Sequence, residues 1–343
     1  MKKSSVRVLA LTSLLAMRAA PAAAQAPTPA APAPAAVPAP APAPVATPAP
    51  SEAAAPAPET PKPKPPPYSL PWQLRGVVPV NGVRLDTSFG FYEGPTTRGG
   101  TAVVPMLSAS YKVLPDLAPL VRLGLVNNAP PNDKSARTNI LNPVLGVLYG
   151  PKIHPNLKLG LFLGMTLPIG SGGGTDPHPQ AAPANAAGAA TRSMMDNAMF
   201  AVNYLAVFPG VGFAYVGHGF TAQVEATVFR LWQTRGPAKA DNANTNFTTG
   251  VHLGYFLAPQ LSLGTELRHQ RWLSTPANVA TDKTDSVRDT TTWAFGPRMH
   301  FKLGESTWLR PGVSLSLPLD NPLAKGKGIS HYQMAQIDIP FVF

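Results

Sequence analysis

Apolar and polar residues alternate along most of the chain from residue 83 onward. In the last nine residues, AQIDIPFVF, Ile337, Ile339 and Phe341 share one parity, and Gln336 and Asp338 take the other. Because successive side chains of a β-strand point to opposite faces, this pattern predicts a strand with one apolar face. The same pattern predicts twelve strands, at residues 83–92, 101–113, 117–127, 140–151, 157–168, 209–216, 220–232, 246–257, 260–272, 291–303, 307–317 and 332–343.

The connections between these strands alternate in length. One set is short and contains turn-forming residues, as at 114–116, 154–156 and 217–219. The other set is longer and polar, and consists of residues 93–100, 128–139, 169–208, 233–245, 273–290 and 318–331. An even number of antiparallel strands with this arrangement is typical of bacterial outer-membrane barrels. The sequence therefore predicts an all-β fold, a transmembrane antiparallel up-and-down β-barrel of about twelve strands, with ten as the alternative because 209–216 is short.

The apolar face of the strands contacts either lipid or a second sheet. In the strand at 157–168, every odd position from 157 to 167 is leucine or methionine. Among charged residues within the strands, only Arg230 and Arg271 have outward parity, and both lie near a long-loop end. A Lys or Arg costs about 2–4 kcal/mol at the bilayer midplane and little at the interface, so this placement favours lipid.

Every second strand has an outward aromatic residue near its short-turn end. Aromatic rings are stable at the level of the lipid headgroups, so we expect this row at one membrane boundary. Trp232 and Trp293, near long-loop ends, are expected at the opposite boundary. The residues expected at the first boundary are Tyr111, Tyr149, Tyr215, Tyr255, Phe301 and either Phe341 or Phe343.

The N-terminal residues differ in composition from the predicted barrel. Three basic residues precede an apolar run at 8–17, and three alanines at 22–24 precede Gln25, which predicts a signal peptide over residues 1–24. Residues 26–67 contain 17 of the 42 prolines. This composition predicts a disordered Pro/Ala-rich periplasmic spacer over 25–69, either a free linker or a tether to the cell wall or a periplasmic protein. The barrel would then comprise residues 70–343.

The C-terminal strand resembles that of single-chain Gram-negative outer-membrane β-barrel proteins, which has alternating apolar residues and a terminal aromatic residue such as Phe343. The signal peptide and the hairpin layout share this resemblance. In that broad group, the barrel-assembly machinery recognises the C-terminal strand. The resemblance therefore implies the same insertion route, outer-membrane lipid as the surroundings and a location in the outer membrane of a Gram-negative bacterium.

Inward parity assigns a set of side chains to the lumen of the barrel, and eight of the charged ones are basic against four acidic. Arginine and lysine rings raise the local concentration of anions, which favours an anion-leaning channel. The alternative is an ion-pair network that fills the interior. The residues are Arg84, Asp86, Lys112, Arg122, Lys158, Glu225, Glu266, Arg268, Arg298, His300, Lys302, Arg310 and Asp338.

The longest connection, 169–208, is expected to begin with a mobile Gly/Ala/Pro-rich part at 170–190. A helix is predicted over 193–208, because Ser193 and Asp196 have capping-box spacing and Pro209 follows. This helix is apolar on several sides, so it is buried either in the lumen, as a gate, or on the barrel rim. Its candidate gate residues are Met195, Met199, Phe200 and Tyr204.

The sequence favours a passive channel for a small solute. The alternative is a structural envelope barrel with a plugged lumen, anchored through its proline-rich arm. An enzyme is disfavoured, because none of the seven histidines has a serine two residues on, as outer-membrane lipases do. No His or Cys cluster has metal-ligand spacing, no cofactor is predicted, and no aromatic-basic pattern indicates a nucleic-acid partner.

Overall fold

The structure is a computed structural model that describes residues 68–93, 99–131, 135–175, 178–237, 242–280, 287–320 and 332–343. All of them lie in one compact unit, Pro61–Phe343. The predicted signal peptide and all but the last two residues of the predicted spacer lie outside the described residues.

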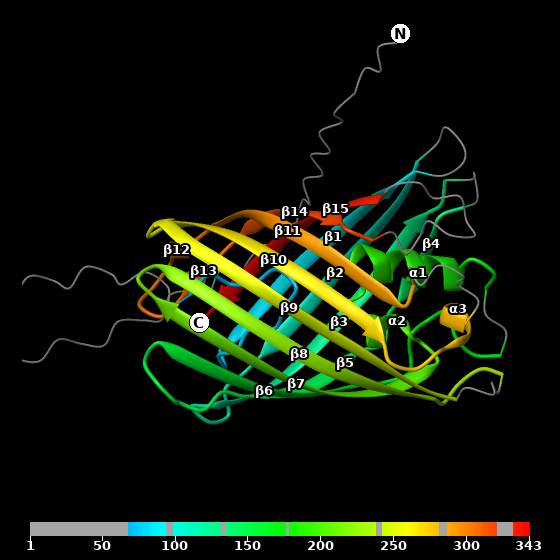
Figure 1. The fold of residues 1–343 in the computed structure, drawn as a ribbon, viewed down its shortest axis with the longest axis horizontal. Helices are drawn as coiled ribbons and strands as arrows, with labels where there is room; N and C mark the ends of the chain where they lie inside the picture. Colours follow the sequence, from blue (N-terminus) through cyan, green and yellow to red (C-terminus); the bar gives the residue numbers. More distant parts are fainter. Residues whose placement is uncertain are drawn as a thin grey trace, which may run out of the picture. The chain divides into compact units, whose positions relative to one another are not determined.

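The described strands pair into one antiparallel sheet whose first and last strands also pair, which closes it into a barrel (Figure 1). β1 and β15 pair from Gly82 with Val342 to Tyr92 with Tyr332. Closure leaves no unpaired edge, as a bilayer requires. In order around the barrel, the twelve strands are β1 (Gly82–Tyr92), β2 (Gly100–Ser110), β3 (Leu117–Ala129), β5 (Val144–Tyr149), β6 (Leu157–Thr166), β7 (Tyr204–Gly217), β8 (Phe220–Gln233), β9 (Ala243–Ala258), β10 (Leu261–Trp272), β11 (Asp289–Met299), β14 (Gly312–Pro318) and β15 (Tyr332–Val342). Three short strands extend this wall, β4 (Arg137–Ile140), β12 (Phe301–Lys302) and β13 (Trp308–Leu309).

The prediction of twelve strands is confirmed, and the alternative of ten is wrong. The strand predicted at 209–216 is longer than expected, because β7 begins at Tyr204. The strand predicted at 140–151 begins at the last residue of β4, which extends back to Arg137, and continues as β5 only from Val144. It is interrupted because the backbone N–H of Asn142 donates to the Met199 carbonyl of the loop inside the barrel, and not to a neighbouring strand.

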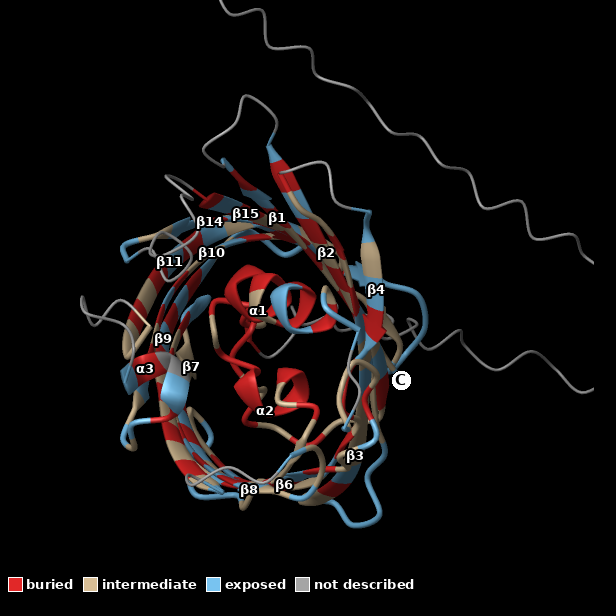
Figure 2. Ribbon diagram, turned by 90° about the vertical axis from the view of Figure 1, so that its right-hand side faces the viewer, coloured by how far each residue is buried: buried red, intermediate tan, exposed pale blue. Residues whose placement is uncertain are grey.

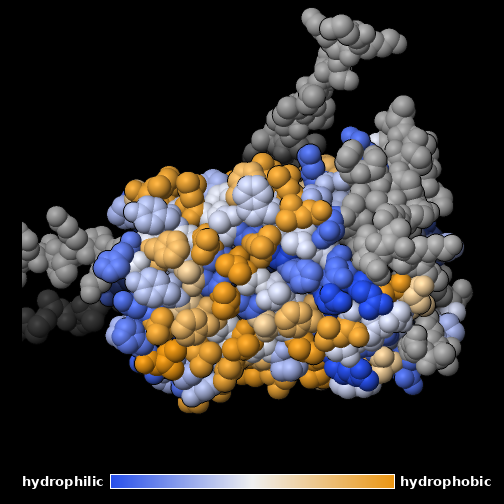
Figure 3. All heavy atoms as spheres, viewed as in Figure 1, coloured by the Kyte–Doolittle hydropathy of each residue, from blue (hydrophilic) through white to orange (hydrophobic). Residues whose placement is uncertain are grey.

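The outer surface of the barrel is apolar between its two ends. Leu161 and Phe295 lie near the middle of β6 and β11 and are 44% and 38% exposed, and Leu263, nearer the short-turn end of β10, is 47% exposed. Hydrophobic side chains cover much of the face seen in Figure 3. Arg230 lies three residues before the long-loop end of β8, and Arg271 lies one residue before that of β10. An apolar exterior on a closed barrel is stable in hydrocarbon, which accepts no hydrogen bonds.

The predicted helix over 193–208 is wrong. Residues 204–208 belong to β7, whose pairing with β8 begins at Tyr204. Only α2 (Asn197–Phe200) is helical, because Ser193 and Met194 have left-handed φ angles of 55° and 58° and turn the chain before it. A longer helix, α1 (Ala181–Thr191), forms within the part expected to be mobile, since alanine is the strongest helix former.

Helices α1 and α2 lie inside the ring of strands (Figure 2). α1 packs against β1, β2, β3 and β4, and its first turn is held by Asn139, whose amide donates to the Ala181 carbonyl at 3.0 Å and to Asn185 Oδ1 at 2.9 Å. A single helical turn, α3 (Ala277–Ala280), lies in another long connection. Among the described helices, none is long and apolar enough to cross a bilayer.

Residues 68–81 enter the lumen from the short-turn end and form a loop inside it, the N-terminal segment (blue in Figure 1). The Ser69 N–H donates to Thr221 at the short-turn end of β8, whereas Trp72 reaches Glu266 near mid-strand. Asn81 is again at the short-turn end, where its side chain accepts the Lys112 N–H. Tyr68 and Ser69, which the sequence assigned to the spacer, are buried in this segment.

Candidate functional site

The lumen of the barrel has an apolar side and a polar side. On β2 to β8, inward side chains form a buried hydrophobic cluster that includes Phe162, Phe208 and Phe229 and packs against Met199 and Phe200 of α2. The Phe208 and Phe229 rings stack with their centroids 4.9 Å apart. On β1, β10, β11, β14 and β15 most buried inward residues are polar, and a smaller hydrophobic cluster includes Tyr92, Tyr332 and Met334. The polar ones include Asp86, Glu266, Arg268, Arg298, Ser314, Ser316, Gln336 and Asp338.

Glu266 attaches the N-terminal segment to the polar side. Its carboxylate accepts the backbone N–H of Trp72 at 2.7 Å and that of Gln73 at 3.0 Å, and it pairs with Arg268. Both charged side chains are fully buried, so water does not compete for these bonds. Arg268 also donates to Ser193 Oγ at 3.0 Å, which links the N-terminal segment to the loop that contains α1 and α2.

Glu225 makes the second attachment. It accepts the backbone N–H of Arg75 at 2.5 Å and pairs with the Arg75 guanidinium. The same guanidinium lies 4.6 Å from the centroid of the Phe162 ring, a cation–π contact at the border between the two sides of the lumen. Arg75 therefore links the polar contacts of the segment to the apolar wall.

Asp338 is shared by two arginines. Arg84 Nε lies 2.7 Å from Asp338 Oδ1, and Arg298 Nη2 lies 2.5 Å from Oδ2. Both arginines also contact the N-terminal segment: Arg84 donates to the Pro71 carbonyl at 3.1 Å, and the Arg298 guanidinium lies 4.4 Å from the centroid of the Trp72 ring. This carboxylate thus organises the wall on which the segment rests.

Arg310 lies next to this cluster and has no carboxylate within 4 Å among the described residues. Its guanidinium donates to the Tyr68 carbonyl, and its Nε donates to His300 Nδ1 at 3.0 Å. The Arg310 carbonyl accepts from Arg298 Nη1 at 2.8 Å, so the two arginines are adjacent. Three arginines therefore gather around the single carboxylate of Asp338.

Four residues, Asp86, Arg122, Arg192 and Asp196, join the loop to the wall and are called the loop latch. Arg122 on β3 lies 2.5 Å from Asp196, and Arg192 binds Asp196 at 3.0 Å and pairs with Asp86 on β1. Burial raises the pKa of Asp196, but the Arg122 and Arg192 guanidiniums outweigh it and lower this pKa to about 2. The loop is therefore held by ionised groups over the physiological pH range.

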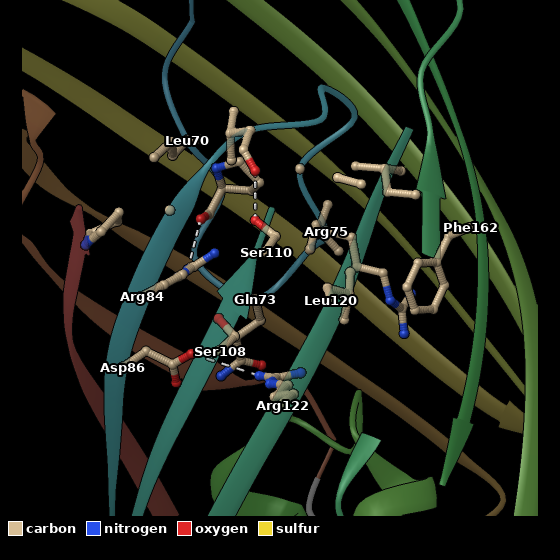
Figure 4. A pocket seen from close by; sticks show the side chains of 18 of the residues that line it. Leu70, Gln73, Arg75, Arg84, Asp86, Ser108, Ser110, Leu120, Arg122 and Phe162 are labelled. Carbon is tan, nitrogen blue, oxygen red and sulfur yellow. Dashed lines mark hydrogen bonds and ion pairs between the residues drawn. The ribbon is translucent and has the colours of Figure 1, made fainter. Parts of the chain in front are cut away.

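A cavity of about 260 Å³ remains between the two inward segments and the barrel wall (Figure 4). Leu120 and Phe162 line its apolar side, and Arg84, Asp86 and Arg122 line its polar side. The cavity extends from Met199 of α2 to Trp308 near the short-turn end, since both residues line it.

Ten of the thirteen residues assigned to the lumen by parity take part in these contacts. The other three, Lys112, Lys158 and Lys302, lie within a few residues of short turns. Lys112 and Lys302 are exposed, and the Lys158 ammonium donates to the Pro155 carbonyl at 2.7 Å. They lie apart from the central network because strand ends near the turns reach past the lumen into solvent.

The predicted gate residues are divided between two elements. Met195, Met199 and Phe200 are buried in the lumen, whereas Tyr204 is the first residue of β7. The predicted interface aromatics lie on the outer surface: Tyr111, Tyr149, Trp232, Tyr255, Trp293, Phe301, Phe341 and Phe343 are exposed, and Tyr215 is partly exposed.

Sequence reasoning missed Arg75, Arg192 and most of the contacts of the N-terminal segment. A signal was present, because Tyr68, Trp72 and Leu74 are apolar residues directly after the prolines, where a solvated spacer would be polar. Arg192 lies between two apolar stretches of the loop, so its burial required a carboxylate partner. Neither signal identifies Asp86 or Glu266 as the partner.

Among the described residues, no group of three or more His, Cys, Asp or Glu side chains could hold a metal ion. A closed antiparallel barrel of twelve strands, with an apolar exterior and a charged interior, defines this chain as a transmembrane β-barrel of the outer-membrane type.

Several solved structures are similar in fold. The outer membrane channel of the COG4313 group from Pseudomonas putida F1 is 13% identical over 78% of this chain and 97% of its own, with a TM-score of 0.49. The NanC porin is 9% identical over 76% and 100%, with a TM-score of 0.47. The KdgM porin is 9% identical over 76% and 99%, with a TM-score of 0.41. No protein-family model and no curated protein sequence matches this chain.

Proposed function

We propose that this protein is an outer-membrane channel for the passive passage of a small solute, and that the lumen is closed in this conformation by two inward segments. The observation that carries the proposal is how these segments are held. Glu225, Glu266 and the loop latch bind them through side-chain ion pairs and hydrogen bonds, which can break and re-form without opening the strand ladder. The gate is the loop 178–203 together with the N-terminal segment.

An anion preference follows from the charge balance of the described lumen. Seven buried or partly buried arginines, at positions 75, 84, 122, 192, 268, 298 and 310, face five carboxylates, at positions 86, 196, 225, 266 and 338, an excess of two positive charges. A positive lumen raises the local concentration of anions. The three lysines near the short turns would extend this preference to the entrance.

The proposal is tested by single-channel recording of the purified protein in planar bilayers. We expect brief openings with the wild type. Glu266→Gln leaves Arg268 without its carboxylate and weakens the hold on Trp72 and Gln73, a loss of about 3–5 kcal/mol for a broken buried pair, so openings become much more frequent. Glu225→Gln should act in the same direction.

The matched control is Glu305→Gln, which changes an exposed glutamate in a short turn and should leave the current unchanged. In a salt gradient, the reversal potential should indicate preferential passage of chloride, and replacing Arg298 and Arg310 with Glu should shift it toward cations. No current from the wild type, Glu225→Gln or Glu266→Gln would contradict the channel.

The filled lumen favours one second candidate, a structural barrel that anchors the envelope. In that case residues 26–67 bind cell wall or a periplasmic protein, and the barrel stays closed in every variant. For either function, residues 1–24 direct export, and the C-terminal strand is recognised by the barrel-assembly machinery. Deletion of residues 26–67 distinguishes the two functions. If the protein is an anchor, the deletion loosens the attachment of the envelope; if it is a channel, the deletion leaves both the attachment and the single-channel current unchanged.

A further inference from the structure

We propose that the lumenal cavity is a binding site for a small apolar molecule that carries one carboxylate, and that Arg310 and Arg84 recognise this carboxylate. The inference rests on the proposed channel function, because the ligand reaches the cavity through the lumen. It names the class of solute, which the charge balance alone does not.

The size of the cavity limits the ligand. An apolar cavity of about 150 Å³ holds one benzene molecule. At about 260 Å³, this cavity has room for one aromatic ring with a short side chain, or for an aliphatic acid of similar volume. An oligosaccharide or a peptide does not fit in this conformation.

The apolar side of the cavity selects the body of the ligand. It is formed by Leu120, Leu148, Phe162, Phe208 and Phe229, whose side chains offer no hydrogen bonds. Against these five side chains a sugar would lose its hydrogen bonds to water without replacement, because the guanidinium beside them, that of Arg75, is already paired with Glu225. A hydrocarbon or aromatic body is instead stabilised by contact with it.

The cationic end of the cavity selects the head group. Arg310 and Arg84 both line the cavity, and both lie beside Asp338, whose single charge is already shared by Arg84 and Arg298. The Nη1 atoms of Arg84 and Arg310 make no hydrogen bond to any described residue. Unused guanidinium donors at a site of excess positive charge favour a carboxylate over a neutral or cationic group.

The other acids of the cavity do not cancel this preference. Asp86 and Asp196 also line it, but both belong to the loop latch and are paired with Arg122 and Arg192. Arg310 is the lining arginine that has no carboxylate partner within the described ranges. The apolar wall and this unpaired cation together define an amphipathic ligand.

The test is calorimetric titration of the detergent-solubilised full-length protein with four probes: 3-phenylpropanoate, its uncharged amide, 3-phenylpropylamine and propanoate. We expect 3-phenylpropanoate to bind at least about tenfold more tightly than the amide, because a charge-assisted hydrogen bond contributes about 1.5–3 kcal/mol. The amine and propanoate should bind more weakly still, since one carries the wrong charge and the other lacks the ring.

Arg310→Gln should weaken 3-phenylpropanoate binding about tenfold or more and change amide binding far less. Lys302→Gln is the matched control, because it removes a cation from the same end of the barrel but outside the cavity lining. Equal affinity of the wild type for 3-phenylpropanoate and its amide, or no binding of either, would overturn the inference. This comparison uses only the wild type, so it remains valid even if a variant does not fold. If the wild type conducts current but binds acid and amide equally, the proposed channel stands and the binding site is refuted. If it prefers the acid but conducts no current, the binding site stands and the channel is refuted.

Discussion

Each acid of the loop latch is bound by two arginines. Asp196 contacts Arg122 and Arg192, and Asp86 contacts the same two guanidiniums, with Arg122 at 3.7 Å. Arginine suits this position because its planar guanidinium can bind two carboxylates at once and stays charged when buried. Removing one acid would leave an uncompensated buried charge, so the four residues act as one unit.

The latch should respond to acid but not to moderate changes in pH. The pKa of Asp196 is lowered from 3.8 to about 2, so its stabilising effect is complete above about pH 4 and is lost as the pH falls through about 2. We expect single-channel activity to stay constant from pH 8 to pH 5 and to rise toward pH 2. Asp196→Asn should raise activity at neutral pH and remove this acid step, whereas Glu305→Gln should keep it. An unchanged acid response in Asp196→Asn would show that the latch does not govern opening.

At the scale of elements, α1 fits the lumen because its residues are small. A Cβ atom added at Gly188 would lie 2.6 Å from Phe200 and 2.7 Å from Val126, so the helix touches α2 and the wall at this point. The N-terminal segment uses the same device, since Val77 packs against Gly160 and Gly212, which are opposite each other on β6 and β7. Small inward residues therefore make room for both inward segments.

Gly188→Ala separates the propensity of α1 from its packing. In an isolated helix this change would stabilise by about 1 kcal/mol. In the lumen it creates a close contact with Val126, whose branched side chain cannot move aside easily, so we expect α1 to loosen by about 1–3 kcal/mol. Hydrogen exchange of the α1 amides should become faster.

The control for this change is Ala182→Gly, at an exposed position of the same helix. It lowers helix propensity by a similar amount without adding a contact, so its effect on exchange should not exceed about 1 kcal/mol. Slower exchange in Gly188→Ala than in the wild type would indicate that the packing at Gly188 is looser than described.

At the scale of the whole molecule, hydrocarbon around the barrel is the physical condition for the fold. The outward apolar residues, such as Leu161 and Phe295, would expose a large apolar surface in water. The charged side chains face the other way and most of them are paired inside the ring of strands, opposite the apolar side of the lumen. In a soluble sandwich the charged side chains would instead lie on the outer surface.

Depth-dependent substitution tests this orientation. Leu161→Arg places a charge at the middle of β6 and should lower the free energy of unfolding in lipid vesicles by about 2–4 kcal/mol. Tyr111→Arg, one residue past the short-turn end of β2, should lower it by about 0–1 kcal/mol. Urea titration of vesicle-folded protein measures both. Equal losses at the two positions, or a monodisperse wild type without detergent, would contradict a membrane-embedded barrel.

Strand number, order and facing were predictable because they depend on local alternation. Arg298 and Asp338 were placed on the inner face by parity alone, and they meet there. The helix over 193–208 was not predictable, because residues 204–208 fit either a helix or a strand, and pairing with β8 decided for the strand. Local propensity does not include the hydrogen bonds that a neighbouring strand supplies.

The sequence by itself determined a barrel of about twelve strands with two chemically different faces, because strand alternation and turn chemistry are written into consecutive residues. The pairing of β7 with β8 decided between twelve strands and ten. Only the tertiary structure decided what occupies the lumen. Glu266 meets Trp72 across 194 positions of the chain, and Arg192 meets Asp86 across 106. Such pairs carry no local pattern, since buried charges are fixed by whichever opposite charge the closed barrel brings within reach.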